Sequence, residues 1–164
     1  MKTIFPFCML LFLTFSGQAQ KKIDRTLRLL NNESVPYIQV SEASSKDNLL
    51  YLDARKKAEY EVSHLKDAIW VGYDEFDPQR LMEFVRDTST TIVVYCSVGV
   101  RSEDIGEKLQ ALGYTNVYNL YGGIFKWKNS GLAVFDTVGK ETNRVHAYNR
   151  LWGKLLTKGE KVYN

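Results

Sequence analysis

Short apolar runs alternate with helical patterns from about Val35 onward, and these runs predict the strands of a sheet. Strands are expected at residues 49–52, 68–71, 91–95 and 116–120, with a further edge strand at residues 37–40. The run at 91–95 is apolar without alternation, which is typical of a strand covered on both faces in a parallel sheet. We therefore expect other elements to pack on both of its faces.

Two stretches between these runs have helical patterns. One covers residues 77–85, with Pro78 suited to the first turn. The other covers residues 102–112, whose apolar positions share one face, and Gly113 follows where a helix C-terminal glycine is expected. Strands that alternate with helices predict an α/β fold with a central, mainly parallel sheet flanked by helices. In such sheets ligands bind beyond the carboxyl ends of the strands.

Residues 1–19 have the pattern of a secretory signal peptide. Lys2 gives a short positive start, residues 4–15 form an almost uninterrupted apolar run, and small residues follow where a signal peptidase would cut. The run is shorter than the roughly 20 residues that a membrane-crossing helix needs. We therefore expect cleavage after Ala19 and export to the periplasm or the extracellular space, with no stable membrane insertion afterwards. An uncleaved membrane anchor is the alternative.

Composition narrows the classes of partner and cofactor. The chain has 164 residues, the size of one domain, with 45% hydrophobic and 25% charged residues. Its net charge of +3, from 22 basic and 19 acidic residues, is too balanced to favour nucleic acid as a partner. Loss of the signal peptide would remove Cys8 and leave Cys96 as the one cysteine. With one cysteine and two separated histidines, no metal site or other cofactor is expected.

Cys96 directly follows the apolar run at 91–95 and precedes the helix expected at 102–112. The turn between them contains Gly99, and Arg101 opens the helix. Backbone N–H groups of such a strand-to-helix turn form an anion-binding concavity, and the helix N-terminus and Arg101 favour the thiolate over the thiol. The arrangement predicts a reactive thiolate with a lowered pKa. A small, buried and inert cysteine is the alternative.

The segment from Cys96 to Ser102 (CSVGVRS) resembles the active-site loop of rhodanese-like sulfurtransferases. Other stretches similar to motifs of that family are residues 52–55, 59–60, 63–68 and 119–124, with Trp127. The resemblance covers roughly residues 37–134 and implies a three-layer rhodanese-like fold. We expect a helical extension at residues 20–36, the rhodanese-like domain at 37–135 and a C-terminal extension at 136–164.

The resemblance implies that Cys96 is the catalytic nucleophile and carries sulfur as a persulfide. It would take the outer sulfur of a small donor, thiosulfate or a persulfide, and pass it to a thiol acceptor, either a small molecule or a protein. The loop residues expected to bind substrate are Ser97, Val98, Gly99, Val100, Arg101 and Ser102. Many members that act on thiosulfate carry a basic residue where this chain has Ser97, so a persulfide or other thiol-based donor is favoured.

Two charged residues, Asp53 and Arg55, follow the run at 49–52. They are therefore expected at the ligand-binding edge of the sheet, where Cys96 is also expected, and both are candidate substrate-binding residues. Arg55 is expected to bind substrate, with a structural role equally open. Asp53 is interpreted as part of the scaffold, because an ionised carboxylate near Cys96 would oppose its thiolate.

The C-terminal extension contains a basic and aromatic stretch at residues 144–158. Its apolar positions, which include Tyr148 and Trp152, follow helical spacing, so a helix docked on the domain is expected. A membrane-surface or partner-binding helix is the alternative. At the other end, a short helix near residues 23–30 is expected to cap the sheet.

Two other functions compete with sulfur transfer. Cysteine phosphatases and arsenate reductases of a related fold use a Cys-x5-Arg loop, whereas four residues separate Cys96 from Arg101 here. The shorter loop suits a single sulfur atom better than a tetrahedral oxyanion. A persulfide carrier or binding module of the same fold would hold sulfur without fast turnover. The intact cysteine, glycine and arginine favour the sulfurtransferase.

Overall fold

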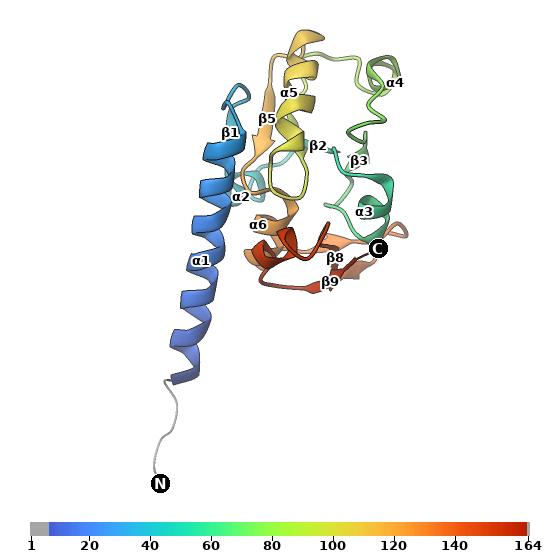
Figure 1. Ribbon diagram of the computed structural model, residues 1–164. Helices are drawn as coiled ribbons and strands as arrows, with labels where there is room; N and C mark the ends of the chain where they lie inside the picture. Colours follow the sequence, from blue (N-terminus) through green and yellow to red (C-terminus); the bar gives the residue numbers. More distant parts are fainter. Residues whose placement is uncertain (1–6, 164) are drawn as a thin grey trace.

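The computed structural model describes the backbone of residues 7–163 and the side chains of residues 17–163. Its centre is a five-stranded sheet in which every neighbouring pair is parallel, in the order β1-β5-β4-β2-β3 (Figure 1). The strands are β1 (Tyr37–Ile38), β2 (Leu50–Asp53), β3 (Ile69–Trp70), β4 (Ile92–Tyr95) and β5 (Val117–Leu120). This arrangement confirms the predicted α/β fold with a parallel central sheet.

Helices cover both faces of the sheet and form two cores. Residues of α4 (Pro78–Phe84) and α5 (Arg101–Ala111) contribute to the first core. Residues of α1 (Phe7–Leu30), α2 (Val40–Ala43) and α6 (Gly123–Asn129) contribute to the second. The short helix α3 (Lys57–Val62) follows β2. Successive side chains of β4 alternate between the cores: Ile92 and Val94 belong to the first, Val93 and Tyr95 to the second. All four are buried, which explains why this run contains no charged residue.

The predicted elements begin and end close to the observed ones. α4 begins after Asp77, whose carboxylate accepts hydrogen bonds from the N–H groups of Gln79 (3.0 Å) and Arg80 (3.2 Å). Gly113 follows α5 with a φ of 92°, as expected at a helix C-terminus. The predicted edge strand at residues 37–40 is shorter than expected, because the chain turns into α2 soon after β1.

The C-terminal extension docks on the domain, but it is not the α-helix that its spacing predicts. Its elements are β7 (Glu141–Thr142), β8 (Arg144–His146), the short 3-10 helix η1 (Trp152–Leu155) and β9 (Glu160–Val162). β7 pairs with β6 (Val134–Phe135), and β9 pairs with β8. Tyr148 has a φ of 64°, which interrupts any right-handed helix at that point. The Asn149 side chain then accepts hydrogen bonds from the N–H groups of Leu151 and Trp152 and starts η1. Val145 is buried as the helical pattern required, whereas Leu151 is 71% exposed.

The N-terminal helix α1 is longer than the short helix expected there. Ile23 and Leu27 are buried in the core, whereas Leu29 is exposed. The predicted cleavage point after Ala19 falls inside α1, and residues 1–6 of the predicted signal peptide lie outside the described residues. Among the helices that the structure describes, none combines the length and the apolar character needed to cross a membrane.

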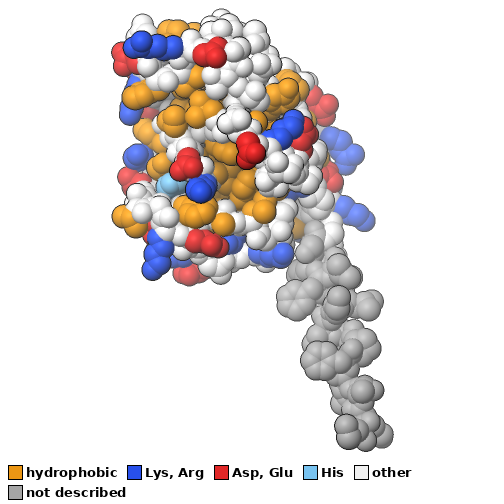
Figure 2. Space-filling model, turned by 180° about the vertical axis from the view of Figure 1, so that it is seen from behind, with side chains coloured by type: hydrophobic (Ala, Val, Ile, Leu, Met, Phe, Trp, Pro, Cys, Tyr) orange, Lys and Arg blue, Asp and Glu red, His pale blue; other side chains and the backbone are white. Residues whose placement is uncertain are grey.

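Charged side chains of both signs are scattered over the face drawn in Figure 2, around apolar side chains that gather in its middle. Lys and Arg lie close to Asp and Glu there, so side chains of the two charges are interspersed on this face. The mixture agrees with the balanced charge of the sequence.

Candidate active site

The candidate active site is the loop between β4 and α5, at the carboxyl end of an inner strand of the sheet. Cys96 is the first residue after β4, and Arg101 is the first residue of α5. Between them Gly99 has a φ of 112°, which residues with a side chain rarely adopt. A Cβ at this position would also come within 3.2 Å of the Leu27 side chain, so the turn requires glycine.

A hydrogen-bond network behind the loop fixes its shape. Asn119 Nδ2 and Asn31 Nδ2 donate to the carbonyl oxygen of Gly99 at 2.8 and 2.9 Å. Asn119 Oδ1 in turn accepts from the Ser102 hydroxyl at 2.8 Å. With the loop held in this way, the Gly99 N–H donates to the Cys96 sulfur at 3.1 Å.

Two opposing influences act on the pKa of the Cys96 thiol, which is 1% exposed. Burial disfavours the thiolate and raises the pKa. The Arg101 charge, the Ser102 hydroxyl at 3.6 Å and the N–H groups of Gly99 and Ser102 favour the thiolate and together outweigh burial, so the pKa is lowered. The Ser102 hydroxyl has one hydrogen, which Asn119 accepts at the shorter distance of 2.8 Å. Arg101 and the backbone N–H groups are therefore the main stabilising groups.

Arg101 is paired with a carboxylate that sequence analysis did not assign to the site. Glu59, on α3, accepts hydrogen bonds from both terminal nitrogens of Arg101, at 2.8 and 3.0 Å. Ser97 Oγ donates to Glu59 at 3.1 Å and accepts from Arg101 at 3.1 Å. Burial raises the pKa of Glu59, but its hydrogen bonds and charge interaction with Arg101 lower it by more, so the carboxylate is ionised. Glu59 therefore largely offsets the positive charge that Arg101 would otherwise present to an anionic donor.

Arg55, which is predicted to bind substrate, does not line the pocket at Cys96. Its side chain is fully buried and donates to Asp53 at 3.0 Å from Nε and 2.6 Å from one terminal nitrogen. The same terminal nitrogen donates to the carbonyl oxygen of Ser63 at 2.6 Å. The pair thus ties the end of β2 to the segment after α3, which is the scaffold role expected for Asp53.

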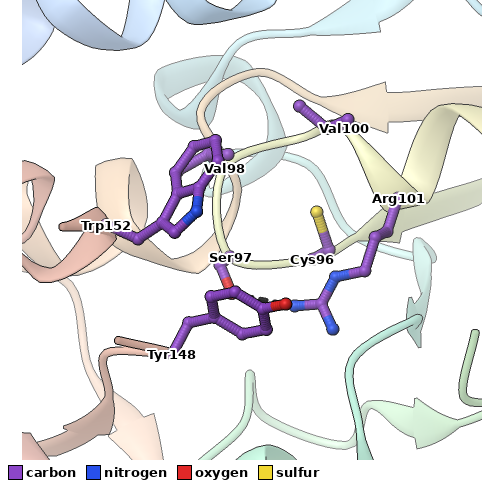
Figure 3. A pocket seen from close by; sticks show the side chains of 7 residues that line it. All are labelled: Cys96, Ser97, Val98, Val100, Arg101, Tyr148 and Trp152. Atoms are coloured by element: carbon purple, nitrogen blue, oxygen red, sulfur yellow. Dashed lines mark hydrogen bonds between the residues drawn. The ribbon is translucent and has the colours of Figure 1, made fainter. Parts of the chain in front are cut away.

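An open pocket of about 130 Å³ leads to the Cys96 sulfur (Figure 3). It is lined by Cys96, Ser97, Val98, Val100, Arg101, Tyr148 and Trp152. Of the other predicted loop residues, Gly99 and Ser102 contact the sulfur from behind instead of lining the pocket. Tyr148 and Trp152 were not predicted as site residues, because their spacing was assigned to helix docking. No group of three His, Cys, Asp or Glu side chains suited to a metal ion occurs in the part of the chain that the structure describes.

Replacing Arg101 with glutamine should move the pH midpoint of Cys96 alkylation to higher pH. The change removes a charge that favours the thiolate and leaves in place the burial that opposes it. Because iodoacetamide reacts with the thiolate, its rate of reaction across a pH series follows the thiolate fraction. Lys46→Gln, at an exposed ion pair, is the control and should leave the midpoint unchanged. An unchanged midpoint in Arg101→Gln would show that Arg101 does not set this pKa.

Comparison with known proteins shows which family and which relatives this chain is similar to. A protein-family model described as a rhodanese-like domain matches residues 38–130. The tRNA uridine(34) hydroxylase of Hamiltonella defensa is 36% identical over 92 residues, which are 54% of this chain and 26% of that protein. The hydroxylase of Yersinia pestis (strain Pestoides F) is 35% identical over the same length. The chain therefore spans about a quarter of these relatives, and their name describes much longer proteins.

Two solved structures have a similar fold. The thiosulfate sulfurtransferase of Pseudomonas aeruginosa gives a TM-score of 0.58 at 21% identity, covering 86% of this chain and 26% of that one. The rhodanese-like domain of an Anabaena protein gives a TM-score of 0.56 at 19% identity, covering 63% and 80%. At these identities the likeness concerns the fold alone, and it agrees with the three-layer arrangement around a parallel sheet.

Proposed function

The chain belongs to the rhodanese-like domain family, and from this premise we propose that it is a sulfurtransferase that carries sulfane sulfur as a persulfide on Cys96. The surroundings of the Cys96 sulfur carry the proposal. The Cys96 sulfur lines an open pocket, accepts a hydrogen bond from the Gly99 N–H at 3.1 Å, and has a lowered pKa. A thiolate stabilised in this way needs no separate general base, and the same N–H groups suit the persulfide anion that replaces it.

Sulfur transfer takes place in two half-reactions that balance without an oxidant. In the first, the Cys96 thiolate attacks the outer sulfur of a donor R–S–S⁻. A bond forms between the two sulfurs, the S–S bond of the donor breaks, and its electron pair leaves with R–S⁻, which takes a proton from water. In the second, an acceptor thiolate attacks the outer sulfur of the Cys96 persulfide and restores the thiolate.

We propose an organic persulfide, and not thiosulfate, as the preferred donor. Thiosulfate is a dianion, and the positive charge of Arg101 is already engaged by Glu59. Ser97 directs its hydroxyl to the same carboxylate, while Val98 and Val100 line the pocket with apolar surface. Transfer of a dianion from water into such a pocket is costly without a free counter-charge.

A covalent intermediate requires ping-pong kinetics. Thiocyanate formation from cysteine persulfide and cyanide, corrected for the rate without protein, should give parallel double-reciprocal lines at several cyanide concentrations. Intersecting lines would show that donor and acceptor must be bound together, which contradicts an obligatory persulfide on Cys96.

We further propose that the protein acts outside the cytoplasm, on a thiol acceptor that is either small or part of a protein. The support is the N-terminal pattern of a positive start, an apolar run at residues 4–15 and small residues before residue 20. In an oxidising compartment an exposed thiolate is open to oxidation, whereas Cys96 is 1% exposed.

A further inference from the structure

Two aromatic side chains in the wall of the Cys96 pocket come from outside the family match. Tyr148 and Trp152 belong to the C-terminal extension, beyond residue 130, where the match ends. We propose that this aromatic wall, formed by Tyr148 and Trp152, makes the site selective for persulfides of apolar organic thiols over inorganic thiosulfate. The inference rests on the proposed sulfurtransferase function and assigns its donor selectivity to residues outside the matched domain.

The backbone at Tyr148 is strained in a way that places its ring at the pocket. Its φ of 64° is uncommon for a residue with a bulky side chain. Two hydrogen bonds hold this conformation: the Tyr148 N–H donates to His146 Nδ1 at 3.1 Å, and the Asn149 N–H donates to the Ala147 carbonyl oxygen at 2.8 Å. Ala147 and Val145 are fully buried and anchor the preceding strand. Strain of this kind persists where the surrounding structure enforces it, and it is concentrated at functional sites.

The Tyr148 ring covers the cation that thiosulfate would need. The guanidinium carbon of Arg101 lies 5.3 Å from the ring centroid, within the range of a cation–π interaction, and Figure 3 shows the two side chains side by side. The nitrogens of the same guanidinium donate to Glu59 at 2.8 and 3.0 Å. A dianion would have to displace these contacts and approach a carboxylate, whereas an uncharged organic group would not.

Trp152 provides apolar surface on another side of the pocket. Figure 3 shows its indole ring beside Val98, on the opposite side of the Cys96 sulfur from Arg101. The backbone N–H of Trp152 donates to Asn149 Oδ1 at 3.0 Å, which fixes the start of η1 and thereby the position from which the side chain extends. An apolar substituent that packs on these surfaces leaves water, and binding is favoured in proportion to the area buried.

The test compares benzyl persulfide, generated in solution, with thiosulfate, using cyanide as the acceptor. The measured quantity is the ratio of kcat/KM for benzyl persulfide to kcat/KM for thiosulfate. Trp152→Ala and Tyr148→Ala should each lower this ratio about tenfold, the lower end of the roughly 10- to 200-fold discrimination expected from apolar contacts. Trp152→Phe and Tyr148→Phe keep an aromatic face and should retain most of the ratio.

Leu151→Ala is the matched control. Leu151 lies on the same segment, is 71% exposed and does not line the Cys96 pocket, so both rates should equal those of the wild type. Thermal unfolding of each variant separates damage to the fold from altered selectivity, because partial unfolding lowers both rates equally and leaves their ratio unchanged.

A second measurement needs no variant. In the wild type, kcat/KM should rise from methyl to propyl to benzyl persulfide, and a flat or falling series would overturn the inference. An unchanged ratio in folded Trp152→Ala and Tyr148→Ala would overturn it as well, while Cys96-dependent turnover of either donor would leave the proposed function intact. Absence of Cys96-dependent turnover with any donor would instead overturn the proposed function, and the inference with it.

Discussion

Replacing Cys96 with serine is expected to lower the protein-dependent rate of thiocyanate formation by about a thousandfold or more. Serine is close in size to cysteine and can accept the hydrogen bond that the Gly99 N–H donates to the sulfur. Its hydroxyl stays protonated at neutral pH and cannot form a persulfide, so the covalent route is lost. The rate is measured with cysteine persulfide and cyanide, and the thermal unfolding midpoint shows whether the fold is kept.

A much smaller loss of rate would show that Cys96 is not the nucleophile. If the folded Cys96→Ser protein kept more than about a tenth of the wild-type rate, another group would be the nucleophile and the proposed mechanism would be wrong. Both proteins are compared in the form that begins after Ala19, as expected after cleavage of the predicted signal peptide. This form lacks Cys8, so a residual rate cannot come from that thiol.

The largest expected effect on stability comes from Asp53→Ala, which should lower the free energy of unfolding by about 3–5 kcal/mol. Asp53 and Arg55 are both fully buried, and their closest pair of atoms is 2.6 Å apart. Removal of the carboxylate leaves a buried guanidinium whose remaining bond is to the Ser63 carbonyl oxygen. An arginine cannot shed its charge as a lysine can, so the penalty falls on the folded state. Urea unfolding measures the change.

An exposed ion pair of the same length provides the control for this prediction. Lys46 and Glu42 are also 2.6 Å apart, with side chains that are 52% and 50% exposed. Glu42→Ala should therefore change the free energy of unfolding by less than about 1 kcal/mol. Similar losses in Asp53→Ala and Glu42→Ala would show that burial does not make the Asp53–Arg55 pair important.

The elements that carry Cys96 could be predicted from the sequence because their signals are local. The uninterrupted apolar run of β4 reflects side chains that enter two cores in turn, and α5 shows one apolar face closed by Gly113. Chain order alone then places the cysteine at the carboxyl end of a strand. The loop glycine is also visible in the sequence, and the structure gives it a φ of 112°, which residues with a side chain rarely adopt.

The groups that reach the Cys96 loop from other parts of the chain could not be predicted, because their contacts join distant segments. Glu59 reaches Arg101 from another helix, 42 positions away in the sequence, and no local pattern encodes that pairing. Tyr148 meets the same guanidinium from the C-terminal extension. The helical spacing of that extension predicted the wrong element, because an apolar period does not reveal the positive φ of Tyr148 or the pairing of β8 with β9.

Intact-mass spectrometry tests most directly whether Cys96 carries sulfur. The protein is reduced, incubated with an organic persulfide or with thiosulfate, and freed of excess donor before measurement. We expect its mass to rise by one sulfur atom with the persulfide, the added sulfur to be removed by cyanide, and the Cys96→Ser variant to gain none. No gain with either donor, although the reduced thiol still reacts with iodoacetamide, would contradict the proposal that Cys96 carries sulfur.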